Sequence, residues 1–427
     1  MTSRRSFIKK SLGIAAPLTS IGSVAIAENV ADALIYLNKA SSAETINDED
    51  LWARLAQAFT VSPTILNLNN GGVSPQPKVV QDAVDRYYHL SNEAPTYYMW
   101  QILDKGREPL RRKLADLLGS SSEEIAINRN TTEALATVTW GLTLAKGDEI
   151  VMSKQDYPNM IHAWKQKQLR DGISIKWLNF ALPIENDDDF VNAFINATTS
   201  KTKIWHITHM INWTGQILPV KKLCDEARKR NIISIVDGSH TFAHLDFKIT
   251  DINPDYFGTS LHKWLCAPFG TGLLYVKKHL IPGLWPLFPN EKPLSDDIRK
   301  FETLGTRSFA PEQAIAHAIE FHHAIGSKRK QERLHYLKNY WCEKVMKHPR
   351  IKLNVSLKAE YSCALGNFTV DGIDTQVVAS RLMSEYQIHT SPIKWENING
   401  VRVTPHVYTT TRDLDRFVEA VLKIADS

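Results

Sequence analysis

A carboxylate and an amine stand in one stretch of the sequence where they could share a cofactor. Asp237 ends the apolar run Ile232–Asp237, and Lys263 follows among apolar and aromatic neighbours such as Trp264. Desolvation lowers the pKa of a lysine amine, which favours an imine with an aldehyde. Pyridoxal 5′-phosphate (PLP) needs such an amine and also a carboxylate against its pyridine nitrogen, because the protonated ring accepts electrons. The pair predicts a PLP site, although a helix cap and a surface charge are the ordinary alternatives.

A second segment has the features of a phosphate-binding site. The string Asn130-Thr131-Thr132-Glu133 follows a predicted strand and opens a predicted helix. A helix N-terminus offers free backbone amides and a positive dipole end, and the threonines add hydroxyl groups. A simple threonine helix cap is the alternative. The chain contains neither Gly-x-x-x-x-Gly-Lys-Ser/Thr nor Gly-x-Gly-x-x-Gly, so a nucleotide site lacks its usual signature.

Short apolar segments recur through the middle of the chain with helical patterns between them. Unalternating apolar strands separated by helices are typical of a mostly parallel sheet covered on both faces. Ligands bind at the carboxyl ends of such strands, which is where Asp237 and Thr131 would lie. We expect strands at Ile125–Asn128, Glu149–Ser153, Ser174–Leu178, Ile204–Thr208, Ile232–Asp237, Tyr256–Thr259 and Gly272–Val276. We expect helices at Pro77–Ser91, Met99–Leu118, Thr132–Leu144, Met160–Arg170 and Val220–Lys229.

The pattern changes near residue 312, where long helices are followed by fewer strands. This predicts an α/β chain with a large PLP-binding domain over residues 67–305 and a smaller C-terminal α+β domain over residues 306–427. Residues 28–66 would form an N-terminal linker or arm. In the smaller domain we expect helices at Glu312–His323 and Lys328–Lys347, strands at Lys352–Val355, Asn367–Val370 and Val401–Thr404, and a last helix from Leu414.

The N-terminal residues have the order of a secretion signal. The string Ser3-Arg4-Arg5-Ser6-Phe7-Ile8-Lys9 precedes a mildly apolar stretch that ends in Ala25-Ile26-Ala27. It predicts a twin-arginine signal peptide over residues 1–27, recognition by the twin-arginine export machinery, and a periplasmic protein. Four basic residues and no acid lie in this segment, so the formal charge of +5 falls to near +1 (5 − 4) without it. We therefore expect no nucleic-acid partner and, with no other long apolar run, no stable membrane insertion after cleavage.

The four cysteines have no spacing typical of metal ligands. They are scattered along the chain without a Cys-x-x-Cys pair, at Cys224, Cys266, Cys342 and Cys363. We expect no structural metal site. An oxidising compartment would permit disulfides, but the sequence does not pair these cysteines.

From Asn67 to Ala425 the chain resembles the class V aminotransferase family of fold-type I PLP enzymes, most of all its isopenicillin-N-epimerase-like branch. The most specific strings are Asp237-Gly238-Ser239-His240 and Ser260-x-His262-Lys263, in this order. Supporting strings are Leu68-Asn69-Asn70-Gly71-Gly72, Asn130-Thr131-Thr132-Glu133-Ala134, Asp156-Tyr157-Pro158, Asn212-Trp213-Thr214-Gly215, Gly305-Thr306 and Arg402-Val403-Thr404-Pro405-His406. The resemblance implies a fold-type I PLP-transferase with a large, mostly parallel seven-stranded sheet and a smaller C-terminal α+β domain.

The resemblance also implies a role for each matching residue. Lys263 would be the Schiff-base lysine and proton shuttle, Asp237 the pyridinium partner, and Tyr157 the ring stacked on the cofactor, where many relatives have histidine. Arg402 would hold the substrate carboxylate. The remaining implied contacts are Thr131, Thr132, Ser260 and His262 to the phosphate, Thr306 to the phosphate of a neighbouring subunit, Asn212 and His240 near the phenolic oxygen, and Asn70 and Gly71 at the substrate entrance. A shared site implies a homodimer.

PLP supports several reactions, so the cofactor alone does not identify this one. We expect aminotransferase-like chemistry on a small-molecule or peptide-derived amino group, with an epimerase, racemase or lyase as the alternative. Cysteine desulfurases use a cysteine on a loop of the small domain, whereas residues 388–401 contain none and Cys363 fits a structural role. The combination of signal and fold also resembles that of a twin-arginine-exported periplasmic PLP enzyme of this branch, which tailors the glutamate side group of the siderophore pyoverdine, and this resemblance implies a comparable maturation role. A non-catalytic periplasmic binding protein is the alternative from another class.

Overall fold

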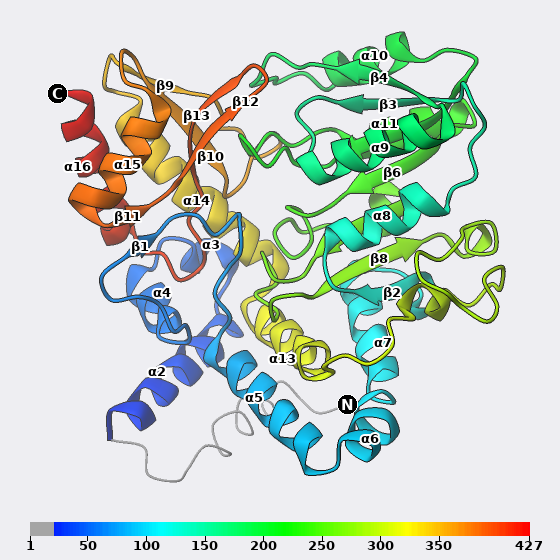
Figure 1. Cartoon of the computed structure of the whole chain (residues 1–427). Coiled ribbons are helices and arrows are strands. Elements are labelled where there is room, and N and C mark those ends of the chain that lie inside the picture. The colour runs from blue at the N-terminus through cyan, green and yellow to red at the C-terminus, as the bar shows by residue number, and fades with distance from the viewer. Residues whose placement is uncertain (1–20) are drawn as a thin grey trace.

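A seven-stranded sheet is the centre of the larger part of the chain (Figure 1). The computed structural model describes residues 21–427, with side chains from Ile26 onward. The strand order is β2-β8-β7-β6-β5-β3-β4; β8 runs antiparallel to β2 and β7, and the other neighbours are parallel. The mostly parallel seven-stranded sheet is thus confirmed. Its strands are β2 Ile125–Asn128, β3 Glu149–Ser153, β4 Ser174–Leu178, β5 Thr202–Thr208, β6 Ile233–Asp237, β7 Tyr256–Ser260 and β8 Gly272–Val276.

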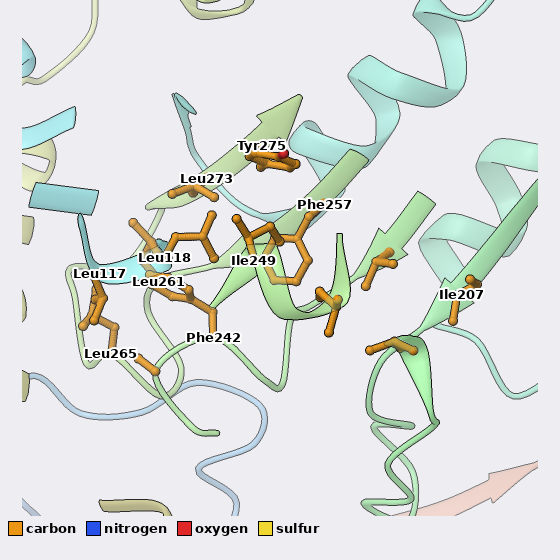
Figure 2. Close-up of a cluster of buried hydrophobic side chains, with 14 of the residues drawn as sticks. Leu117, Leu118, Ile207, Phe242, Ile249, Phe257, Leu261, Leu265, Leu273 and Tyr275 are labelled. Atoms are coloured by element: carbon orange, nitrogen blue, oxygen red, sulfur yellow. The ribbon is translucent and has the colours of Figure 1, made fainter. Parts of the chain in front are cut away.

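Both faces of this sheet are buried, because successive residues of a strand enter different hydrophobic cores. Ile125 and Ile127 of β2 belong to one cluster, and Ala126 between them belongs to another. Figure 2 shows part of the first cluster, including Phe257 of β7 and Leu273 of β8. This explains why the strands read as continuous apolar runs. The longer helices of this part are α5 Lys78–Glu93, α7 Arg107–Leu118, α8 Thr131–Gly141, α9 Pro158–Asp171, α10 Asp187–Ala197, α11 Val220–Lys229 and α13 Ala310–Ile325, with the short α12 Ile249–Ile252.

The smaller part is built on a four-stranded antiparallel sheet of order β12-β13-β10-β9. Trp341 and Phe417 meet edge to face across its core, with ring centroids 5.5 Å apart. β12 and α15 had not been predicted from the sequence. The elements are β9 Ile351–Leu353, β10 Gly366–Val370, β12 Ser391–Trp395, β13 Ile398–Val403, α14 Ser327–Val345, α15 Thr375–Tyr386 and α16 Thr411–Ala425. A separate parallel pair, β1 Leu66–Asn67 and β11 Ile388–His389, joins the segment before α5 to the segment before β12.

The predicted boundary at residues 305 and 306 does not coincide with a change of core. Helix α13 follows that boundary, yet its Ala314 and Ile315 pack in the core of the large sheet. The next helix, α14, contributes Leu337 and Trp341 to the core of the small sheet. The change of core therefore falls between α13 and α14.

Residues 28–66, expected to form a linker or arm, are helical in their first part. It contains α2 Ile21–Leu37, α3 Ser42–Thr45 and α4 Glu49–Ala56. Leu51, Trp52 and Leu55 are buried in a cluster that also contains Phe321 and Tyr408. Their spacing is that of one face of a helix, which is the signal that was missed. The predicted signal peptide lies mostly outside the described residues and stays a prediction.

The helix predicted over Met99–Leu118 is interrupted before α7. A short helix, α6 Pro95–Tyr97, runs into the π-helical turn η1 Tyr98–Leu103, where the Asp104 amide donates to the Met99 carbonyl. At Gly106 an added Cβ would lie 2.5 Å from the Gln313 side chain of α13, so the chain passes α13 closely there. The 3₁₀ turns are η2 Ser122–Glu124, η3 Lys278–Leu280 and η4 Ile298–Glu302. Among the described residues, no helix is both long and apolar enough to cross a bilayer.

Candidate active site

The carboxyl ends of the parallel strands border a cavity of about 570 Å³. Asp237 is the last residue of β6 and Ser260 the last of β7, while Tyr157 and Asn212 follow β3 and β5. Open parallel sheets bind their ligands at this edge. The residues predicted from the sequence that line the cavity are Gly71, Thr131, Thr132, Tyr157, Asn212, Asp237, His240, Ser260, His262, Lys263 and Arg402.

Hydroxyl groups gather at one end of the cavity, at the N-terminus of α8. The Thr131 Oγ1 lies 2.8 Å from the Ser260 Oγ, and the Thr131 amide donates to the same oxygen at 3.0 Å. The Ser239 hydroxyl lies 2.8 Å from the Thr131 Oγ1. The helix cap is the Asn130 side chain, so neither Thr131 nor Thr132 is used for capping. This end has the donors and the helix dipole that a phosphate requires.

Asp237 presents a buried carboxylate to the cavity. Its Oδ1 accepts hydrogen bonds from the Ser239 amide, at 2.9 Å, and from the Ser239 hydroxyl. Burial, and then the charge of Asp156, raise the pKa of Asp237 above its ordinary value. A cation placed against this carboxylate would offset the cost of burying it. The protonated nitrogen of a pyridine ring is such a cation.

The Lys263 amine faces His240, whose ring is oriented by a hydrogen bond from Trp264. Its Nζ lies 3.3 Å from the His240 Nε2, and the Trp264 indole donates to the His240 Nδ1 at 3.4 Å. The Trp264 ring in turn stacks between His244 and His406, with centroids 3.8 and 5.4 Å away. Burial lowers the pKa of Lys263 to about 8, so the neutral amine is a much larger minority near physiological pH than for an ordinary lysine.

Arg402 brings a buried positive charge to the cavity from strand β13. Its Nη1 donates to the Asn212 carbonyl at 2.9 Å and its Nη2 to the Asn69 Oδ1 at 2.8 Å. Within the described part of the chain, its Nε has no hydrogen-bond partner, and neither does the buried Asn212 Oδ1. Burial lowers the pKa of Arg402 to about 10, which leaves it charged at neutral pH. The guanidinium is therefore anchored, with donors left for an anion.

Two predicted residues do not reach the cavity of their own chain. Asn70 is fully buried beside it, where its Nδ2 donates to the Thr404 carbonyl at 2.8 Å and its Oδ1 accepts from Tyr408. Its amide supports the entrance and does not line it. Thr306 also lies outside the lining. Tyr157 is present at the cavity with 41% of its surface exposed.

Sequence reasoning missed several contributors to this site. Ser239 belongs to the Asp237-Gly238-Ser239-His240 string, but only the structure shows that its hydroxyl joins Asp237 to Thr131. Trp213, which follows Asn212, lines the cavity and stacks on Trp395 with centroids 5.4 Å apart. Their positions directly after recognised residues were the available signal.

The donor set fits PLP. The hydroxyl cluster, the Asp237 carboxylate and the Lys263 amine line one cavity, whose volume is in the range of small-molecule sites. The side-chain Oδ1 of Asn212 is also buried, without a hydrogen-bond partner in the described part of the chain. Phosphate, ring nitrogen and aldehyde would thus each meet the group that its chemistry requires. His206 and Asp156 lie behind Asp237 and complete its surroundings.

Comparison with known families agrees with this fit. Residues 66–417 match the family described as aminotransferase class-V. The chain belongs to that family. It is therefore a PLP-dependent enzyme, as the sequence analysis predicted, and the expected isopenicillin-N-epimerase-like branch is confirmed by relatives.

The alignments with relatives cover most of this chain and most of each relative. An isopenicillin N epimerase from Amycolatopsis lactamdurans is 28% identical over 395 residues, covering 88% of this chain and 98% of the relative. A cysteine desulfurase from Haloferax volcanii is 25% identical over 384 residues, covering 84% and 88%. Among solved structures, the cysteine desulfurase CsdA from Escherichia coli has a TM-score of 0.76 at 21% identity, and the match covers 88% of this chain and 98% of that chain. The cystine C-S lyase C-DES has a TM-score of 0.76 at 20% identity, and the match covers 84% of this chain and 97% of that chain. The structures establish the fold-type I architecture, and the relatives carry more than one reaction.

Proposed function

We propose that this enzyme moves a proton at the α-carbon of an amino acid or of a peptide-derived amino group, in aminotransferase-like chemistry. The observation that carries the proposal is that the Lys263 amine and the Arg402 guanidinium line the same cavity. PLP, when bound, supplies an electron sink for negative charge at that carbon. Arg402 would hold the substrate carboxylate through paired hydrogen bonds. Lys263 would then transfer the proton at the α-carbon.

The contacts of Lys263 support a role in proton transfer. An indole N–H only donates, so the His240 Nδ1 that faces Trp264 is an acceptor and the proton of neutral His240 lies on Nε2. Burial, and then the charge of Lys263, hold the pKa of His240 well below its ordinary value. The Nε2–H then points at the Lys263 amine, 3.3 Å away. His240 would orient a neutral amine, which is the form that accepts a proton.

Epimerisation is the second candidate, because relatives named isopenicillin N epimerase match this chain at 28% identity. The test is incubation of the PLP-loaded enzyme with a panel of amino acids and peptide-linked amines in deuterated water. Amino transfer predicts a keto product and loss of the near-visible absorption of the enzyme. Epimerisation predicts deuterium at the α-carbon of both stereoisomers without a keto product. The absence of both outcomes, with Lys263→Ala behaving like the wild type, would contradict the proposal.

Two other functions have less support. All four cysteines are buried and none lines the cavity, and burial raises the pKa of Cys363 to about 12, which opposes a thiolate nucleophile. Sulfide release from L-cysteine that is lost in Cys363→Ala would restore the desulfurase hypothesis. A non-catalytic binding protein would require that purified chain stay colourless after addition of PLP.

We further infer a homodimer that shares its active sites. Thr306 lies outside the cavity of its own chain, as a contact to the phosphate of a second subunit would require. Exposed aromatic residues around α5 and η1, namely Tyr88, Tyr97 and Trp100, offer an apolar surface for such a partner. Light scattering over a dilution series tests this, and a fully active monomer would contradict it.

Export by the twin-arginine route to the periplasm is proposed on the sequence around Arg4 and Arg5 alone. Together with the fold, that location supports our proposal of a maturation role on a peptide-derived metabolite. Fractionation of cells producing the full chain or Arg4→Lys/Arg5→Lys tests the route. Retention of the double variant in the cytoplasm supports it, and unchanged periplasmic recovery contradicts it.

A further inference from the structure

A second carboxyl group lies buried behind Asp237, outside the cavity. Asp156 follows β3, His206 lies in β5 and Trp164 lies in α9, and all three are fully buried. None of them lines the cavity. Asp237 is the partner of Thr208 in the parallel pairing of β5 with β6, two residues after His206. The three residues come from the loop after β3, from β5 and from α9, and β5 pairs both with β3 and with the strand that ends in Asp237.

Hydrogen bonding fixes the proton position of His206. The Trp164 indole donates to the His206 Nδ1 at 3.2 Å. Because an indole N–H only donates, this nitrogen is an acceptor and the ring proton lies on Nε2. The Nε2 is 3.4 Å from the Asp156 Oδ2. The other oxygen, Asp156 Oδ1, accepts from the Tyr157 amide at 2.7 Å. The approach of His206 to Asp156 is close, but within the described residues neither the His206 Nε2 nor the Asp156 Oδ2 has a hydrogen-bond partner.

The two carboxyl groups influence each other electrostatically. Burial raises the pKa of Asp156 to about 7, which the Thr208 side chain and the Tyr157 amide oppose. Burial and the Asp156 charge raise the pKa of Asp237, while Ser239 and His206 lower it. His206 stays neutral because burial lowers its pKa to about 4. From the remaining side, Lys263 faces Asp237, whose charge raises the pKa of the amine against the larger effect of burial. Two like charges this deeply buried do not both ionise easily.

We propose that Asp156, oriented by His206 and Trp164, is a positioning residue that controls the charge of Asp237 and thereby the hold on the cofactor's ring nitrogen. Without the cofactor, burial and the repulsion between the two carboxylates oppose ionisation of both groups. A protonated ring nitrogen against Asp237 adds a positive charge and allows both groups to ionise. The inference rests on the proposed function only through the binding of PLP opposite Asp237.

The sign of the pH dependence follows from this arrangement. A bound cation lowers the pKa of Asp156 relative to the free enzyme, so the bound state holds fewer protons. The affinity for a protonated ring therefore rises with pH up to the free-enzyme pKa, about 7, and then levels off. Asparagine at position 156 keeps the acceptor for the Tyr157 amide but cannot ionise. The variant should lose this rise.

The experiment measures binding to the full chain freed of cofactor, at pH 5.5 and pH 8.5. The probe is 4′-deoxypyridoxine 5′-phosphate, which has the ring nitrogen and phosphate of PLP but no aldehyde, so Lys263 chemistry does not enter. Both proteins experience the same titration of the probe itself. We expect the affinity gain between the two pH values to be about tenfold greater in the wild type than in Asp156→Asn, as a shift of one pKa unit would give. An analogue with carbon in place of the ring nitrogen should abolish the difference.

Variants of two buried tryptophans provide a second, independent comparison. Trp164→Phe removes the donor that orients His206 and should reduce the pH-dependent gain. Trp205→Phe is the matched control, because its indole lies next to His206 in β5 but donates to the Thr198 hydroxyl at 3.0 Å. Equal gains in the wild type, Asp156→Asn and Trp164→Phe would overturn the inference, as would a difference that persists with the nitrogen-free analogue. Failure of the wild type to bind PLP at all would instead refute the proposed function.

Discussion

The strongest test of substrate recognition is the replacement Arg402→Lys. The Arg402 guanidinium donates one hydrogen bond to the Asn212 carbonyl and one to the Asn69 Oδ1. Its Nε–H and the second hydrogens of Nη1 and Nη2 can donate to a carboxylate. A lysine has three donors, so holding the same two acceptors would leave one for the substrate. One charge-assisted hydrogen bond is lost, which is worth about 1.5–3 kcal/mol. The affinity for a carboxylate should fall roughly ten- to hundredfold.

The assay compares an amino acid with its primary amide by spectral titration of the PLP-loaded enzyme. The wild type should prefer the amino acid, and Arg402→Lys should lose most of that preference while binding the amide nearly unchanged. Arg333→Lys is the control, since Arg333 is also buried but lies outside the cavity, bonded to Glu49. It should lower the melting temperature without changing the preference. Equal losses for amino acid and amide in Arg402→Lys would refute the carboxylate role.

Three further outcomes are expected. The rate at which cofactor-free enzyme gains near-visible absorption on addition of PLP should rise with pH and level off near pH 8. The reason is that burial lowers the pKa of Lys263 to about 8 and the neutral amine is the nucleophile. A rate that still rises at pH 10 would mean that Lys263 has the pKa of an ordinary lysine. Ser239→Ala should weaken PLP binding about three- to tenfold by removing a hydroxyl bonded to Asp237, and a dissociation constant equal to that of the wild type would exclude this contact. Gly238→Ala should lower the unfolding free energy by about 1–3 kcal/mol in denaturant titration, since the new Cβ would lie 1.9 Å from the Phe257 ring; an unchanged midpoint would show that the ring can move aside.

Much of the site could be predicted because strand ends are visible in sequence. Asp237 and Ser260 close apolar runs, and parallel strands bring their carboxyl ends to one edge of the sheet. Residues distant in the chain, such as Thr131 and Arg402, were placed there by motif, and the structure brings both to the cavity. The same motif reasoning placed Asn70 at the cavity too, but its side-chain amide is hydrogen-bonded to Thr404 and Tyr408 instead. A motif records that a residue lies near a site, whereas only packing decides where its side chain points.

Other features had no signal at the level of pattern. Trp164, His206 and Asp156 come from a helix, a strand and a loop, and each reads singly as an ordinary core or turn residue. Nothing in their spacing indicates that the indole orients the imidazole, or that the imidazole faces the carboxyl group. The interrupted helix before α7 likewise depends on the contact of Gly106 with Gln313 of a distant helix.

By itself, the order of residue types determined the architecture and the kind of chemistry, because hydrophobic periodicity specifies strands and helices and because an amine and a carboxylate have the same reactivity wherever the chain carries them. The tertiary structure alone decided which of the site's groups are neutral, which are charged and which nitrogen of His206 and His240 carries the proton. Those properties depend on desolvation and on partners contributed by separate elements, such as Trp264 for His240 and Trp164 for His206. They arise only once the chain has folded and water has left the space around them.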